Sequence, residues 1–331
     1  MNKAKPQTLN IFQIIFKGIA IYIRHFIPLS RAMLFPVFGQ IIGIAAVLYP
    51  AFIVFQTNHK LIETHATSAN ILLSFIILII SVLPGFFIFT RSFTEFLIVM
   101  ASSNAMVASI VKNGNIKDFK QFNQAIKQRG GQYFALIMYF ALIWLAGFMV
   151  PFGVFFLSGK INGALLTLAF ALLELLAFLV LIIVSVYLSL GYQVFAFEEI
   201  SALKVIKRSW NLVEGNFWRT FILGGIVMFL TSLIIPLLFQ MGIEKTGVAN
   251  YLSYPLNMYF AITMADPGSL SELSAILKPL HLSSVFSDYT VLDFSKKMTM
   301  SLLNMIVSEF VLPLASACYT LLYLDILARK K

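Results

Sequence analysis

The stretch GALLTLAFALLELLAFLVLIIVSVYLSLGYQVF, residues 163–195, decides the fold, because Glu174 is the one charged side chain in its 33 residues. A helix needs about 20 mainly apolar residues to cross a bilayer. Every backbone amide in hydrocarbon must also bond within its own helix, since no water is there to replace that bond. We therefore predict a membrane-spanning helix over this stretch, long enough to tilt or protrude.

Five further stretches meet the same requirement. The whole chain is 60% hydrophobic and 11% charged, which is far more apolar surface than a soluble domain can bury. We predict an all-α polytopic membrane helical bundle in which residues 1–331 form a single membrane domain. The six spans lie near 34–55, 71–90, 133–157, 163–195, 217–241 and 298–323. The second span is expected to continue as a helix past Arg91 toward Val111.

The basic residues indicate the orientation of these spans. With six spans, segments 1–33, 91–132, 196–219 and 324–331 share one side of the membrane and carry 5, 6, 4 and 3 Lys and Arg, 18 of the 24 in the chain. Cytoplasmic loops are enriched in Lys and Arg. We therefore predict that both termini are cytoplasmic and that the long connection 242–297 lies outside.

Composition also limits the classes of partner. The net charge of +10 is gathered between apolar runs, so it indicates membrane topology and no nucleic-acid partner. The single cysteine, Cys318, excludes an intrachain disulfide. We find no phosphate-binding glycine loop, zinc-protease motif or nucleophile elbow. We expect no metal, no cofactor and no enzymatic activity.

The cytoplasmic segments before the first, third and fifth spans share one pattern. Each segment has an amphipathic helix, then a small or polar turn, then an aromatic residue that leads into the membrane. The stretches that align with one another are residues 22–26, 127–134 and 212–218. Such helices lie at the lipid surface with their cations at the head groups. We predict three of these interfacial elbow helices, either as a threefold internal repeat or as independent helices of similar chemistry.

The third elbow carries the strongest signal for lipid contact. Cations can reach anionic lipid phosphates, and tryptophan prefers the head-group level of a bilayer. Plain anchoring and recognition of a specific lipid both fit this pattern, with anchoring the simpler interpretation. The expected anchoring residues are Lys204, Lys207, Arg208, Trp210, Trp218 and Arg219.

Residues 202–219, ALKVIKRSWNLVEGNFWR, resemble the most recognisable stretch of the membrane domain found in the glycerophosphodiester phosphodiesterase membrane-domain family and in related bacterial six-span proteins. The stretch TLLYLD, residues 320–325, is similar to the end of that family's last span. The resemblance implies a bacterial inner-membrane protein whose membrane domain has no established activity. The phosphodiesterase activity belongs to a soluble domain fused to some members, and we expect none here.

Two carboxylates fall within predicted spans, Glu174 in the fourth and Glu309 near the middle of the sixth. A charge at this depth is costly, so each should face protein or water, and each marks a candidate site. Helical spacing places polar residues on one face with each of them. These companions are Thr167, Ser185 and Ser189 for Glu174, and Ser316 and Thr320 for Glu309. Alternatively, each carboxyl group is neutral and hydrogen-bonded as part of helix packing.

Two functions remain open. The first is a non-enzymatic membrane module that assists or organises envelope and lipid components. The second is a transporter or lipid-moving protein whose polar path is lined by Glu174 and Glu309. The two differ most at Glu309, which a coupled transporter needs and a packing module does not. Gly39 and Gly43 fit a close-packing face, for internal packing or for a homodimer, and a protein partner is also compatible with the first function.

Overall fold

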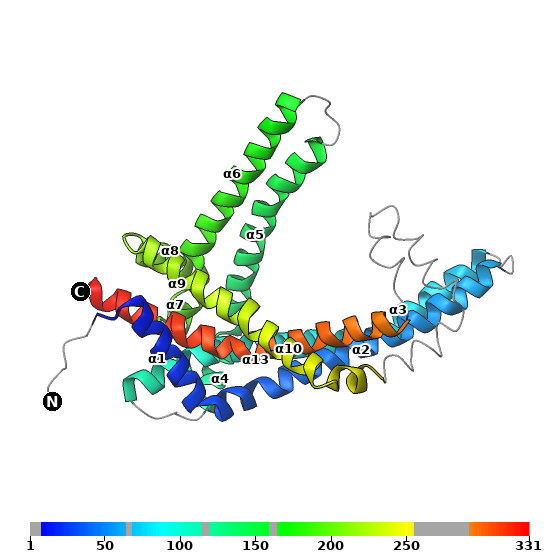
Figure 1. The fold of residues 1–331 in the computed structure, drawn as a ribbon, viewed down its shortest axis with the longest axis horizontal. Helices are drawn as coiled ribbons and strands as arrows, with labels where there is room; N and C mark the ends of the chain where they lie inside the picture. Colours follow the sequence, from blue (N-terminus) through cyan, green and yellow to red (C-terminus); the bar gives the residue numbers. More distant parts are fainter. Residues whose placement is uncertain (1–7, 64–67, 114–118, 159–163, 255–290, 331) are drawn as a thin grey trace. The chain divides into compact units, whose positions relative to one another are not determined.

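The computed structural model describes residues 8–63, 68–113, 119–158, 164–254 and 291–330, and every element in these ranges is helical (Figure 1). The predicted all-α helical bundle is therefore confirmed. The helices are α1 (Ile11–Arg24), α2 (Phe26–Glu63), α3 (Ser68–Asn113), α4 (Phe119–Gln128), α5 (Gly130–Ser158), α6 (Ala164–Leu188), α7 (Gly191–Phe197), α8 (Ala202–Val213), α9 (Phe217–Phe229), the π turn η1 (Leu230–Ile234), α10 (Ile235–Lys245) and α13 (Val291–Arg329).

Six of the described helical stretches are long and apolar enough to cross a membrane. They are Phe26–Leu48, Phe75–Val111, Gly130–Met149, Leu168–Phe197, Phe217–Lys245 and Ser295–Arg329. Each overlaps one of the six predicted spans, so the chain is a multi-pass membrane protein. Of the predicted outer connection, residues 255–290 lie outside the described residues.

The helices extend further than the predicted spans at several ends. α2 begins at Phe26, well before the predicted start at residue 34, because Pro28 falls in its first turn, where no amide donor is needed. α3 is one helix of 46 residues, as expected from its continuation past Arg91. At 1.5 Å per residue it is about 70 Å long, more than twice the roughly 30 Å of hydrocarbon that a span must cross.

The fourth and fifth spans are interrupted helices. The fourth breaks at residues 189–190, between α6 and α7. The fifth contains η1, which ends directly before α10 and its Pro236. Proline has no amide hydrogen and its ring crowds the preceding turn, so the helix widens there. Length and hydropathy alone give no sign of either interruption.

Three short amphipathic helices precede the odd-numbered spans, as predicted. α1, α4 and α8 are joined to α2, α5 and α9 by linkers of one to three residues. In α8 the buried positions are Ala202, Val205, Ser209, Leu212 and Val213, which follow the helical repeat. The three elbow helices and the hairpins that follow them match the predicted arrangement, whereas their descent from a repeated unit stays a prediction.

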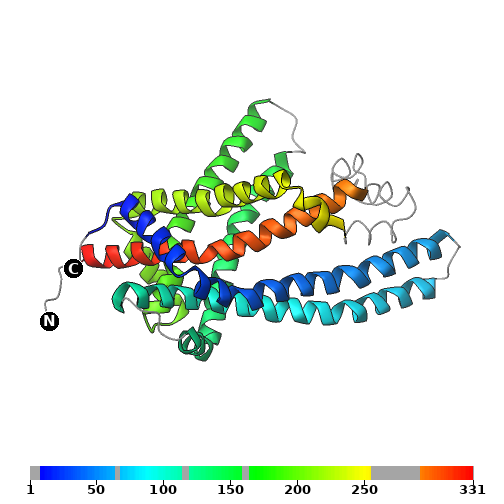
Figure 2. The same ribbon diagram turned by 60° about the horizontal axis from the view of Figure 1, so that its bottom comes forward.

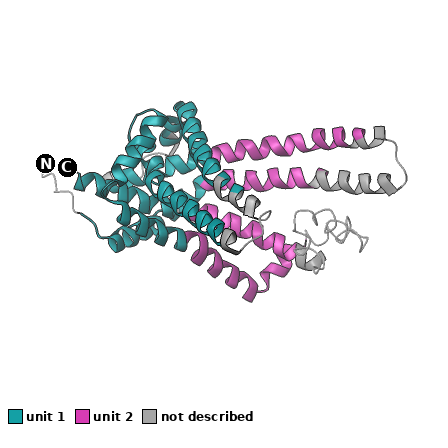
Figure 3. Ribbon diagram, turned by 90° about the horizontal axis from the view of Figure 1, so that it is seen from above, with its two compact units in different colours: residues 1–32, 97–230, 312–331 teal, residues 33–96, 231–311 magenta. Residues whose placement is uncertain are grey.

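The chain forms two compact units, coloured separately in Figure 3. Unit 1 contains residues 1–32, 97–230 and 312–331, and unit 2 contains residues 33–96 and 231–311. All three elbow helices belong to unit 1. Within unit 1, the hydroxyl of Tyr133 donates to the carbonyl of Leu97 at 2.7 Å, and Gln193 Nε2 donates to Asn104 Oδ1 at 3.3 Å.

Glycines bring α2 and α3 into close contact within unit 2, where the two helices run side by side (Figure 2). A Cβ on Gly43 would lie 2.6 Å from the backbone nitrogen of Phe89, and one on Gly85 would lie 2.6 Å from that of Val47. Gly39 likewise faces Ser92. The two glycines of the predicted close-packing face therefore serve internal packing, and a homodimer stays a prediction.

Replacing Gly43 with alanine tests this packing. Its Cβ would meet the backbone of α3, so the two helices must separate, at a cost of about 1–3 kcal/mol. We expect Gly43→Ala to lower the midpoint of thermal denaturation in detergent. Gly225→Ala is the matched control, because a Cβ there meets no described atom within 4 Å. Equal midpoints for the two variants would contradict the close approach.

Candidate functional site

Glu309 of α13 is a buried carboxylate in unit 2, with 9% of its surface exposed. Gln40 of α2 is also buried, and its Nε2 donates to Glu309 Oε2 at 3.4 Å. A carboxyl group inside a spanning helix needs such a partner, because an unpaired polar group in hydrocarbon is costly. This contact between two spanning helices of unit 2 is called the Gln40–Glu309 pair below.

The sequence predicts Glu309 but not its partner. The two residues are 269 positions apart, and no local pattern relates them. A signal was nevertheless available, because Gln40 is the one amide or charged side chain in the predicted first span. A polar residue there must find a partner on a neighbouring helix.

The polar residues predicted to share a face with Glu309 are buried as well. Ser316 and Thr320 lie in the part of α13 that belongs to unit 1. The hydroxyl oxygen of Thr320 has no hydrogen-bond partner among the described residues. Glu309 and these two residues therefore contribute to different units.

Glu174 lies half-buried on α6 in unit 1. The other residues of its predicted stripe bond to their own helix, since Ser185 Oγ donates to the Leu181 carbonyl at 2.6 Å and Ser189 Oγ to that of Val186 at 2.7 Å. Such back-bonding satisfies a hydroxyl in an apolar helix. The side chain of Thr167 lies outside the described residues. A joint path lined by Glu174 and Glu309 stays a prediction.

The third elbow presents two kinds of side chain. Lys204 and Lys207 of α8 are exposed, and so are Trp218, at 71%, and Trp210, at 41%. Trp210 stacks on Tyr187 with ring centroids 4.0 Å apart, which fixes its plane against α6. Exposed lysines and tryptophans on one segment are what a lipid head-group contact requires.

Both arginines of the predicted anchoring set bind carboxylates of unit 1. Arg208 Nε lies 3.0 Å from Glu198 Oε1. The same carboxylate oxygen accepts a hydrogen bond from the hydroxyl of Tyr323 at 3.0 Å, so Glu198 joins α8 to the end of α13.

Arg129, which was not in the predicted anchoring set, donates to the carbonyls of Phe195 and Ile200 at 3.0 and 3.1 Å, which caps the C-terminal end of α7.

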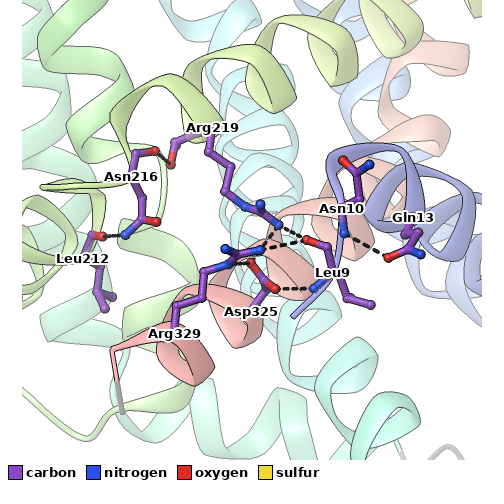
Figure 4. Close-up of polar contacts among 9 residues, drawn as sticks. Leu9, Asn10, Gln13, Leu212, Asn216, Arg219, Asp325 and Arg329 are labelled. Atoms are coloured by element: carbon purple, nitrogen blue, oxygen red, sulfur yellow. Dashed lines mark hydrogen bonds and ion pairs between the residues drawn. The ribbon is translucent and has the colours of Figure 1, made fainter. Parts of the chain in front are cut away.

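Arg219 belongs to a buried ion-pair cluster that sequence analysis missed (Figure 4). Its Nη2 lies 2.8 Å from Oδ2 of Asp325, and Arg329 Nε lies 2.9 Å from the same oxygen. The other oxygen, Oδ1, accepts the backbone amide of Leu9 at 2.6 Å. Both guanidinium groups also donate to the Leu9 carbonyl. We call these four residues the Asp325 clamp.

The Asp325 clamp fixes the entry of α1. Leu9 is held to α9 and α13 by the clamp, and the next residue, Asn10, donates its amide to Gln13 Oε1 at 2.9 Å in the first turn of α1 (Figure 4). The Asp325 side chain is fully buried and that of Arg219 is 17% exposed. Removing one member of a buried ion pair leaves an uncompensated charge, which is strongly destabilising.

Comparison of the chain with protein-family models, with curated proteins and with solved structures found no significant match.

Asp325→Asn tests the clamp. The variant keeps the side-chain shape but removes the charge shared by Arg219 and Arg329, so we expect a loss of about 3 kcal/mol or more. The measurement is the free energy of unfolding in detergent, or the corresponding shift of the thermal midpoint. Glu214→Gln removes an exposed carboxylate from the same unit and should change little. If both variants unfold alike, Asp325 does not hold the clamp.

Proposed function

We propose that the chain is a non-enzymatic module of the bacterial inner membrane that organises anionic lipids and assists other envelope components through its elbow helices. Both termini and all three elbow helices then lie on the cytoplasmic side.

The main observation in support of the proposal is the exposed face of the third elbow helix, α8. One face of α8 is buried in unit 1, and the other presents Lys204 and Lys207, with Trp210 and Trp218 exposed at either side of the turn into α9. A helix of this kind lies in the plane of the interface and attracts anionic lipids through its cations. The anionic leaflet that it fits best is the cytoplasmic one.

The charge distribution supports the orientation. Every elbow helix precedes an odd-numbered span, so the three share one side of the membrane. Segments on that side carry 18 of the 24 Lys and Arg, which is the bias expected of the cytoplasmic side.

The polar contacts of unit 1 support a structural role for its charged groups. Asp325 and Glu198 each bind arginine and a second donor, and Arg129 caps a helix, so their charges are used in holding helix ends together. The resemblance of residues 202–219 to the glycerophosphodiester phosphodiesterase membrane-domain family agrees with a membrane module that has no reaction of its own.

Lipid enrichment around the reconstituted protein tests the proposal. We expect wild-type protein in mixed bilayers to enrich phosphatidylglycerol over phosphatidylcholine, as measured by lipid mass spectrometry of the particles. Each lysine at the surface contributes about 1 kcal/mol of attraction. The variant Lys204→Gln/Lys207→Gln should therefore lose affinity by up to about fivefold per lysine.

Lys245→Gln is the control, because Lys245 is exposed and ends the same fifth span. Removing this single lysine should lower the enrichment of phosphatidylglycerol less than the elbow variant does, because it deletes one charge and the elbow variant deletes two. An elbow variant that enriches phosphatidylglycerol as strongly as this control would overturn the proposed lipid contact.

A further inference from the structure

Unit 1 contains a cavity of about 510 Å³ next to the Asp325 clamp, which we call the α1 cavity. Its walls come from α1, the end of α3 and the last turns of α13. The volume lies in the range of pockets that hold small ligands. The residues that matter for its chemistry are Lys17, Arg24, His25, Val111, Leu321 and Leu324.

One wall of the α1 cavity is cationic. Lys17 and Arg24 stand two helical turns apart on α1, so they share a face, and both are exposed. Asp325 is the one carboxylate among the described lining residues, and it is already bound by Arg219 and Arg329. Within the described residues, Lys17 and Arg24 have no ion pair. The cavity therefore carries uncompensated positive charge.

The part of the lining that comes from α3 and α13 is mostly aliphatic. Val111 ends the second span, and Leu321 and Leu324 lie in the last turns of the sixth. The cavity consequently lies where apolar span and polar surface meet. A ligand that suits both walls has an anionic group at one end and hydrocarbon at the other.

We propose that the α1 cavity binds the phosphate of an anionic phospholipid. Lys17 and Arg24 contact the phosphate, and the aliphatic wall contacts the glycerol end of the acyl chains. Phosphate could also come from a soluble molecule, but only a lipid uses the aliphatic wall. This inference rests on the proposed function, which places α1 at the anionic cytoplasmic leaflet. It adds one saturable lipid site to the non-specific attraction of α8 for anionic lipids.

The test uses the full chain in detergent and measures binding by native mass spectrometry and by thermal shift. The probes are dioctanoyl phosphatidylglycerol, dioctanoyl phosphatidylcholine, glycerol 1-phosphate and inorganic phosphate. We expect the first to bind at one saturable site and to raise the thermal midpoint. In Lys17→Gln/Arg24→Gln its affinity should fall at least tenfold.

A second variant tests whether the lipid occupies the cavity while Lys17 and Arg24 are retained. Ala20 lines the cavity and is exposed, so Ala20→Trp should fill space without disturbing a packed core. We expect it to weaken the same lipid. Arg31→Gln removes an exposed cation of unit 1 that does not line the cavity, and its affinity should equal that of wild type.

The outcomes separate the two proposals. If Lys17→Gln/Arg24→Gln and Ala20→Trp bind dioctanoyl phosphatidylglycerol as tightly as Arg31→Gln, the α1 cavity is not the site, even when the elbow variant loses its lipid enrichment. If soluble phosphates bind as tightly as the lipid, the aliphatic wall has no role and the lipid assignment is overturned. A third outcome is that the α1 variants lose affinity for dioctanoyl phosphatidylglycerol while the elbow variant Lys204→Gln/Lys207→Gln enriches phosphatidylglycerol as wild type does. That outcome would support the cavity and overturn the proposed role of the elbow.

Discussion

Every backbone amide that enters hydrocarbon must bond to a carbonyl of its own helix, and this constraint shapes the rest of the structure. It requires spans that are helical over most of their length, and the six described spans are helical, with one short interruption each in the fourth and the fifth. It also disfavours unpaired polar side chains, because a hydroxyl or carboxylate inside a span is costly without a local or neighbouring partner. Ser185 bonds to its own helix, and Glu309 bonds to Gln40 across unit 2.

The charged contacts of unit 1 gather at helix ends. Arg129 caps α7, Glu198 joins α8 to α13, and the Asp325 clamp ties Leu9 to α9 and α13. Helix ends leave unpaired backbone groups and lie near water, so charges there cost less than charges deeper in a span. Within the part of the chain that the structure describes, Lys17, Arg24, Lys204 and Lys207 of the same unit form no ion pair, so their charges remain available to an anionic lipid.

Features that depend on neighbouring residues were predicted well, and those that depend on distant residues were not. Hydropathy and helical repeat located the six spans and the three elbow helices, because both signals are contained in a short window. The Asp325 clamp joins positions 9, 219, 325 and 329, and the Gln40–Glu309 pair joins two separate spans. No local pattern specifies such contacts. Arg219 illustrates the consequence, since its sequence neighbours indicate lipid while its structural neighbour is Asp325.

The side of the membrane on which the elbow helices lie decides whether α8 can face the anionic cytoplasmic leaflet. Single cysteines at Lys207 and Lys245, in a chain whose native Cys318 is buried, can be probed in intact cells with a membrane-impermeant maleimide. We expect labelling at position 245 in intact cells, and at position 207 only after the membrane is permeabilised. Labelling of both positions in intact cells, or of position 207 alone, would contradict this expectation.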